Sequence, residues 1–395
     1  MLSAVGENRL MPKPEVDSIL INASSGHTRT NRSWVLSRML RDFDHWRPRV
    51  CDEVEQDKLD ELLEANKQSS KPRDEDEIRV GLRVTVWDCH SASGRGSGDA
   101  IYWVGMLVSA LQLGIAAVPW GLYGEWFTFF VTAAGTLLAY ASGSLPQWWD
   151  EKVGVRHMKP TAPIKDVILT EGNGAKDAIL ILGCNSGMDL EALAAPQREL
   201  RSPWSTRILT IVLAILWTAL LISVAGWEQH TWFILGVGTI GILHNVLVAG
   251  MKRQPHAFGI NLVYQCTIVE GKVMEVLRLV EEAYPRAGAA MRDTFFPGKL
   301  RPRERLLWEY AERRAEKWEE RASGQSVDAK SDAWPMPPLA SPLGKKDDTD
   351  IPASGPYPRS NSGNNSNSVA APINNTPAPG GKTANQAIDV YSQAV

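Results

Sequence analysis

The polar side chains that could do chemistry within otherwise apolar sequence are Gln112, His244 and Asn245. A strongly polar side chain in hydrocarbon is costly, so such residues usually face the interior of a helix bundle. Because histidine can change its charge near neutral pH, the three could line an intramembrane polar path for a small solute. The alternative, which we favour, is hydrogen bonding between packed helices. The apolar runs that contain these residues hold no Asp, Glu, Lys or Arg, which argues against a proton-coupled pump.

One short motif suggests proteolysis. The run Gly96-Ser97-Gly98-Asp99 matches the GxGD pattern of intramembrane aspartyl proteases, in which two aspartates within the membrane would activate water. Asp99, however, precedes its apolar run, and no other apolar run contains an aspartate to pair with it. We therefore interpret this stretch as a flexible loop that places Asp99 at a helix N-terminus, where a carboxylate is favoured.

Motifs for metal binding and nucleophilic catalysis are missing from the sequence. The histidines show no HxxxH or HExxH spacing, and Cys89-His90 is an isolated pair. GxSxG is also absent, and the glycines of residues 91–99 form neither a GxxxxGK(S/T) phosphate loop nor a GxGxxG nucleotide-binding loop. Asp189 and Glu191 stand two apart, so on a helix they would point away from each other and could not share a proton. We expect no catalytic, cofactor-binding or metal-binding residues, and a protein that is not an enzyme.

Four apolar runs must position the polar residues. Two lie within residues 101–145 and are joined by a turn at 122–125, and the other two, at 208–226 and 232–250, are joined by a turn at 227–231. Each holds about 20 apolar residues, enough for an α-helix to cross ~30 Å of hydrocarbon. A chain in lipid must satisfy its own backbone, which favours helices. The predicted fold class is an α-helical integral membrane protein with four transmembrane helices in two hairpins.

The distribution of charge predicts the orientation of these spans. Both turns lack Lys and Arg and contain only Glu125 and Glu228, whereas the stretch between the second and third runs holds eight basic residues. By the positive-inside rule, both termini and the central loop are cytoplasmic. The net charge of −3 argues against a nucleic-acid partner.

The polar segments carry strand patterns as well as helix patterns. Residues 79–87 alternate as a half-buried strand does, residues 167–182 read as a β-hairpin turned at Asn173-Gly174, and residues 262–269 read as a further strand. We expect these pieces to combine into one small cytoplasmic α+β unit.

The predicted organisation has six parts. They are a cytoplasmic N-terminal region with amphipathic helices and little order before residue 30 (1–98), the first transmembrane hairpin (99–147), a cytoplasmic loop with a β-hairpin (148–206), the second transmembrane hairpin (207–250), a cytoplasmic α/β segment ending in a charged helix (251–322), and a disordered tail (323–395).

Two chemical features depend on this orientation. The four cysteines, Cys51, Cys89, Cys184 and Cys266, are scattered singly, so we expect reduced thiols facing the cytosol. Four glycosylation sequons begin at Asn22, Asn31, Asn364 and Asn374, all in segments predicted to be cytoplasmic.

Four runs of residues carry a resemblance. Residues 97–105, 143–148, 169–174 and 295–301 are similar to stretches of multi-pass membrane proteins of unassigned function predicted in filamentous fungi, over about residues 30–320. The resemblance implies integral membrane character, and it transfers no functional residue.

Two functions fit these patterns. The first is a non-enzymatic scaffold or assembly component that binds a protein partner through its cytoplasmic parts. The alternative is a small-solute transporter or channel, with its path near His244 and Asn245. Four spans enclose little pore volume, so a transporter of this kind would be a homo-oligomer. We expect membrane lipid as a partner, and no cofactor.

Overall fold

The structure is a computed structural model that describes residues 10–69, 74–94, 96, 98–153, 157–158, 165–184, 187–195 and 204–322. The chain divides into two units, Met1–Ile351 and Pro352–Val395, and every described residue belongs to the first. The tail predicted to be disordered, residues 323–395, lies outside the described residues.

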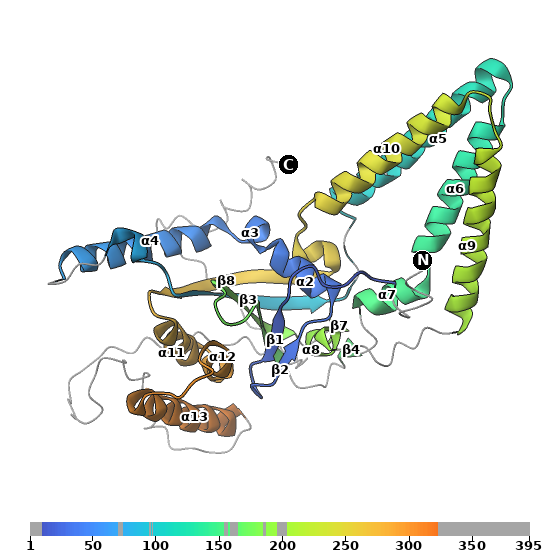
Figure 1. The fold of residues 1–395 in the computed structure, drawn as a ribbon. Helices are drawn as coiled ribbons and strands as arrows, with labels where there is room; N and C mark the ends of the chain where they lie inside the picture. Colours follow the sequence, from blue (N-terminus) through green and yellow to red (C-terminus); the bar gives the residue numbers. More distant parts are fainter. Residues whose placement is uncertain are drawn as a thin grey trace, which may run out of the picture. The chain divides into compact units, whose positions relative to one another are not determined.

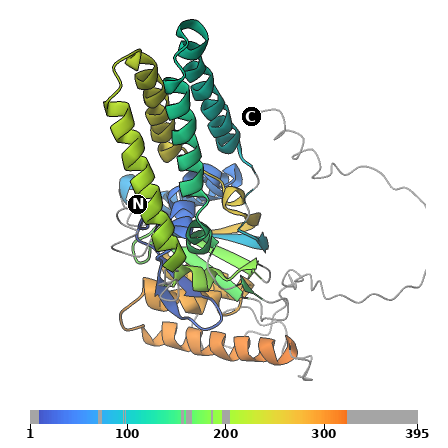
Figure 2. The same ribbon diagram turned by 90° about the vertical axis from the view of Figure 1, so that its right-hand side faces the viewer.

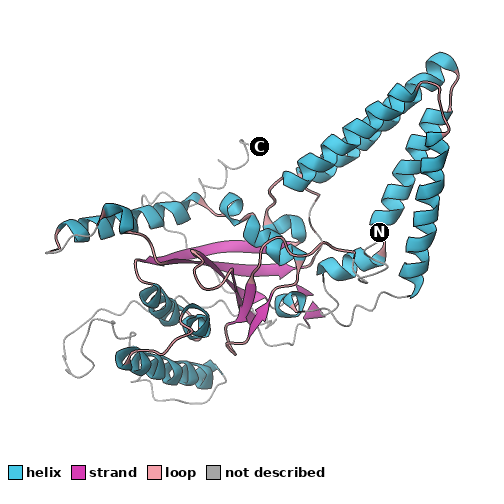
Figure 3. Ribbon diagram, in the orientation of Figure 1, coloured by secondary structure: helices cyan, strands magenta, loops and turns pink. Residues whose placement is uncertain are grey.

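A mixed eight-stranded sheet lies at the centre of the described part of the chain outside the apolar helices (Figures 1 and 3). Its strands are β1 (Ile19–Asn22), β2 (Thr28–Thr30), β3 (Leu82–Ala92), β4 (His157–Met158), β5 (Lys165–Thr170), β6 (Asp177–Cys184), β7 (Gly187–Met188) and β8 (Ile260–Glu270). The order is β2-β1-β5-β6-β3-β7-β4, and β8 pairs with β3. β3 runs parallel to β6 and antiparallel to β8.

The sheet combines segments from each side of the apolar helices. β3 precedes the first of them, the β5–β6 hairpin lies between the second and third, and β8 follows the fourth. These segments therefore form one α+β unit, as the strand patterns predicted. The predicted hairpin turn is present, but its positive φ angles belong to Gly172 and Gly174 rather than to Asn173.

Helices cover both faces of this sheet. One apolar cluster joins Trp87 and Cys89 of β3 to α2 (Trp34–Arg41), α3 (Phe43–Trp46) and α8 (Leu190–Ala194). The other joins Leu82, Val84 and Val86 to α11 (Val273–Ala283), α12 (Ala287–Phe295) and α13 (Pro302–Ala322) (Figure 2). Because neighbouring side chains of a strand point to opposite faces, β3 contributes side chains to both clusters. A further helix, α4 (Arg49–Lys67), contacts β8 through Cys51 and Lys58.

Glu281 fixes the corner between α11 and α12. Its buried carboxylate accepts hydrogen bonds from the backbone N–H groups of Arg286 (2.8 Å) and Ala289 (2.9 Å). Arg286 adopts a positive φ of 74° at this corner. From α13, Arg314 donates to the carbonyl oxygen of Glu282 at 2.8 Å. One carboxylate and one guanidinium thus join three helices.

Within the described residues, three helices are long and apolar enough to cross a membrane. They are α5 (Ala100–Tyr123), α9 (Trp204–Ala225) and α10 (Thr231–Gly250). A fourth, α6 (Phe127–Gly143), qualifies only together with α7 (Pro146–Val153), which follows it after a bend of 43°. Large apolar side chains such as Leu107, Ile222 and Trp232 are exposed along these helices, as lipid contact requires.

The apolar helices pack across the two predicted hairpins. α5 lies beside α10, and α6 contacts α9 (Figure 1). The two turns meet where Tyr123 stacks on His230 with ring centres 4.3 Å apart, and Phe127 stacks on Trp227 at 4.2 Å. Nε2 of His230 also lies 3.5 Å from the Glu125 carboxylate. Aromatic contacts therefore join the hairpins at the end remote from the basic loop.

Two expectations differ from the structure. Residues before 30 were expected to have little order, yet β1 pairs antiparallel with β5, and Leu20 and Ile21 are fully buried. A four-residue strand is too short to show a period, and its partner lies far away in sequence. The cysteines were expected to be reduced, yet Cys89 is disulfide-bonded, whereas Cys51 and Cys266 are free. The side chain of Cys184 lies outside the described part.

Candidate functional site

The predicted intramembrane residues lie along the contact between α5 and α10. Gln112 Nε2 donates to the carbonyl oxygen of Val237 at 3.0 Å. His244 lies against Gly105, where an added Cβ would be 3.6 Å from Cε1 of the imidazole. Its Nε2 atom is buried and has no hydrogen-bond partner among the described residues. Asn245 is exposed.

In the described part of the chain, no hydrogen bond joins these three side chains. The Gln112 amide lies beside Gly241, where an added Cβ would be 2.9 Å from Nε2. Gly241 precedes His244 by three residues, which is roughly 4.5 Å along the helix axis. Gln112 therefore contributes to helix packing, whereas His244 occupies another level of the same contact. The polar path remains a prediction.

A second cluster lies where α10 ends, and α2 positions it. Ser33 begins α2 in an extended conformation, and its hydroxyl oxygen accepts a hydrogen bond from Leu36 N. Leu36 and Met39 of this helix are fully buried in the apolar cluster on the sheet. That packing fixes the direction of the helix, and it brings Arg38 and Asp42, one turn apart, to the end of α10.

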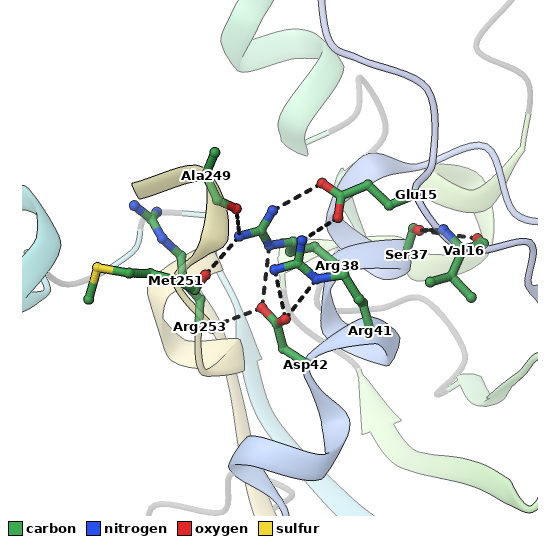
Figure 4. Close-up of polar contacts among 9 residues, drawn as sticks. All are labelled: Glu15, Val16, Ser37, Arg38, Arg41, Asp42, Ala249, Met251 and Arg253. Carbon is green, nitrogen blue, oxygen red and sulfur yellow. Dashed lines mark hydrogen bonds and ion pairs between the residues drawn. The ribbon is translucent and has the colours of Figure 1, made fainter. Parts of the chain in front are cut away.

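Arg38 caps the last turn of α10 (Figure 4). Its Nη2 atom donates to the carbonyl oxygens of Ala249 (3.0 Å) and Met251 (2.8 Å). The last carbonyls of a helix lack partners within it and carry the negative end of its dipole, so a guanidinium is well suited to this position. Only 5% of Arg38 is exposed.

Asp42 completes the cluster. It is 1% exposed, pairs with Arg38 Nε at 3.3 Å, and accepts a hydrogen bond from the backbone N–H of Arg253 at 2.9 Å. Arg41 pairs with Asp42 as well, and Glu15 pairs with both arginines. We call the side chains of Glu15, Arg38, Arg41 and Asp42, with the backbone of residues 249–253, the Arg38–Asp42 clasp.

The clasp also reaches the beginning of α5. Nε of Arg253 lies 3.9 Å from Oδ2 of Asp99. Asp99 is the N-cap of α5, and its Oδ1 accepts from Tyr102 N at 3.0 Å. This capping role is the one predicted for Asp99 in place of intramembrane proteolysis. The charges of the clasp cancel in pairs, so its chemistry is attachment of α2 to the ends of two apolar helices.

Sequence reasoning missed the clasp. Arg38 and Asp42 stand four apart on a helix, a spacing that indicates an ion pair on one helix face. The partners at the end of α10 are backbone carbonyls, however, and a carbonyl leaves no signature in residue type. The sequence therefore indicates the Arg38–Asp42 pair but not its partners at the end of α10.

Asp189 and Glu191 have a common partner. Nζ of Lys165 lies 2.7 Å from Asp189 and 3.2 Å from Glu191, and Asp189 is also the N-cap of α8. Burial raises the pKa of Glu191, but hydrogen bonds from Asn22 and Lys165 and the charges of Lys165 and Arg29 outweigh it, so the pKa is lowered. Within the described residues, no group of three or more His, Cys, Asp or Glu could hold a metal ion.

Comparison of the chain with protein-family models, with curated proteins and with solved structures returns no match.

Proposed function

We propose that this chain is a non-enzymatic, four-span membrane protein that acts as a scaffold or assembly component through its soluble α+β unit. The observation that carries the proposal is the Arg38–Asp42 clasp, in which buried charges hold α2 to the last carbonyls of α10. A scaffold needs a fixed relation between its anchor and its binding surface. Buried, hydrogen-bonded charges with directional geometry supply such a relation.

The strand connections support the same proposal. β3 and β8 each connect through a short segment to an apolar helix, and the β5–β6 hairpin is connected through α7 and α8 to the apolar helices on either side of it. The soluble unit is therefore attached at several points of its sheet, unlike a domain on a single linker. In the orientation that the Lys and Arg bias favours, this unit faces the cytoplasm together with both termini.

The test compares full-length variants in their own membrane. Arg38→Met opens the clasp, whereas the control Arg29→Met removes a half-buried ion pair with Glu191, away from the clasp. Affinity purification at equal membrane levels should recover a defined protein in stoichiometric amounts with the wild type and with Arg29→Met. Arg38→Met should recover at least fivefold less of it. If the wild type recovers no stoichiometric partner, the scaffold proposal is wrong.

The full chain is required because the sheet needs strands from three separate segments. A soluble fragment that lacks β3 or β8 would leave β6 without its parallel neighbour or β3 without its antiparallel one. Capture by isolated segments would therefore test a different structure.

A second function, solute passage, is favoured by one observation. Nε2 of His244 is buried without a hydrogen-bond partner among the described residues, a costly arrangement that a passing polar solute would relieve. Stopped-flow swelling of proteoliposomes in urea or glycerol tests it. Passage predicts swelling above that of empty liposomes, lost in His244→Ala and retained in Asn245→Ala. Swelling equal to that of empty liposomes contradicts this function.

A further inference from the structure

The sheet has one long open edge. β8 contains 11 residues and pairs with β3 along one side only, and no other described strand pairs with its second side. The opposite end of the sheet is β2, which has three residues. An open edge presents a row of unpaired N–H and C=O groups that can template another strand.

β8 carries few of the features that usually protect an edge. Residues 260–269 contain no charged residue and no proline. Its single charge, Glu270, stands at the far end and pairs with Lys58 at 2.9 Å. Natural edge strands commonly carry lysine or proline, or are very short. Two irregularities in the β3–β8 register interrupt the ladder locally, but pairing continues to Glu270.

Burial along the two strands shows that the edge is uncovered. Val86, Trp87 and Cys89 of β3 are buried. Their partners on β8 are Cys266, Tyr264 and Leu262, and these are only half-buried. Val263 is 45% exposed, and Asn261 and Gln265 are exposed on either side of it. This membrane-proximal half of β8 is therefore accessible from the side and from one face.

We propose that β8 pairs antiparallel with β8 of a second copy of this chain. Two identical strands can pair antiparallel about a two-fold axis, because residue i of one copy then lies opposite residue j of the other, and residue j of the first lies opposite residue i of the second. The chemistry of the edge matches itself: it is free of charge, so no like charges would lie opposite each other. The two strands are also equal in length, and membrane anchoring confines both copies to one layer.

The proposal goes beyond the scaffold function, because it concerns how copies of this chain meet and requires no other partner. Recruitment of a strand from another protein is the competing outcome. A charged strand would gain the main-chain hydrogen bonds of this edge but no ion pair, since the edge offers no opposite charge.

The test uses the full chain in lipid nanodiscs or mild detergent, with its oligomeric state measured by mass photometry over a concentration series. In a self-pair centred on Tyr264, residue 263 of one copy lies opposite residue 265 of the other. The double variant Val263→Lys with Gln265→Lys would therefore place like charges opposite each other. We expect it to weaken the dimer at least tenfold. The matched control, Thr28→Lys with Thr30→Lys, adds the same charges to exposed positions of β2 and should leave the dimer unchanged.

A charge-swap experiment separates self-pairing from other causes. Copies with Val263→Glu and Gln265→Glu should also be monomeric, whereas an equal mixture of Lys and Glu copies should form heterodimers. Protection of the buried Cys51 thiol from alkylation shows that each variant is folded. A monomeric wild type, a Lys variant that still forms dimers, or a mixture that stays monomeric would each overturn the proposal. Partner recovery by the monomeric variants then reports separately on the scaffold function.

Discussion

The Nη2 atom of Arg38 lies 2.8 Å from the carbonyl oxygen of Met251, a residue 213 positions later in the chain. This bond joins a helix of the soluble unit to the end of the last apolar helix. Its energetic weight comes from burial, because an unmade hydrogen bond costs most where water cannot replace it.

Removing the guanidinium should therefore destabilise the fold. We expect Arg38→Met to lower the free energy of unfolding by about 3 kcal/mol, since the α10 carbonyls lose their donor and Asp42 loses one of its partners. The urea midpoint for alkylation of the buried Cys51 measures the change. Arg29→Met, at an ion pair whose arginine is about one-third exposed, should cost less than about 1 kcal/mol. Equal losses of unfolding free energy in the two variants would show that the clasp stabilises the fold no more than the Arg29 ion pair does.

Glu281 should make stability depend on pH. Burial raises its pKa from 4.5 to about 7, against the opposing effect of hydrogen bonds from Arg286 and Ala289 and of the Arg314 charge. The fold thus favours the protonated acid. Its contribution is complete below about pH 4.5 and is lost as pH rises through about 7, a change of roughly 3 kcal/mol.

The variant that tests this pH dependence is Glu281→Gln. The amide never ionises. Its single carbonyl oxygen can accept from one of the two backbone N–H groups, which donate to separate oxygens of the carboxylate. Urea midpoints between pH 5 and 8 should fall for the wild type and stay nearly flat for Glu281→Gln. Glu282→Gln, at the neighbouring and more exposed carboxylate, is the control and should follow the wild type. A falling curve for Glu281→Gln would assign the pH dependence to other groups.

Gln112 should matter modestly for packing. Replacing it with leucine removes the hydrogen bond to Val237, and such bonds between membrane helices contribute about 0.6 kcal/mol on average. We expect Gln112→Leu to lower the unfolding midpoint slightly. Asn245→Leu, at an exposed position, should lower it less or raise it. A loss of several kcal/mol in Gln112→Leu would indicate that the amide does more than join α5 to α10.

The disulfide at Cys89 makes orientation measurable. Disulfides persist in oxidising compartments, whereas the Lys and Arg bias favours a cytoplasmic soluble unit. We expect Cys89 to be alkylated when cells are quenched rapidly in acid and the protein is alkylated under denaturing conditions, because burial alone would protect the folded thiol, and to be disulfide-bonded after purification in air. Peptide mass spectrometry of both samples distinguishes the states. Protection of Cys89 in the quenched cells would reverse the proposed orientation.

The sequons in the N-terminal region should carry no glycan in the folded protein. The Asn22 amide donates to Glu191, and the Asn31 amide donates to Ser18 and to the carbonyl oxygen of Ser33; both side chains are buried. A glycosidase should therefore leave their peptides unchanged on either side of the membrane. A sequon inserted at the exposed turn residue Gly124 would report orientation instead. A glycan on Asn31 would contradict the fold around β1.

Local patterns predicted much of this fold. Apolar length located α5, α9 and α10, and alternation located β3 and the β5–β6 hairpin, because those signals lie within one segment. β1 was missed because its four residues gain their order from β5, and the clasp because its acceptors are backbone atoms. The bend between α6 and α7 was missed as well: the apolar run continues through Leu145 and conceals it. Contacts between distant segments leave no periodic pattern in the residues, so they cannot be predicted from one sequence alone.

The placement of β3 and β8 on opposite sides of the apolar helices determines when the protein can finish folding. During synthesis β3 emerges before any apolar helix, and its antiparallel neighbour emerges only after the last one. Until then β3 lacks a neighbour on one side, and the carbonyls at the end of α10 do not yet exist for Arg38 to bind. A nascent chain that stalls or misplaces one span would keep that strand open to chaperones and proteases. Completion of the sheet thus reports that every membrane segment has been inserted.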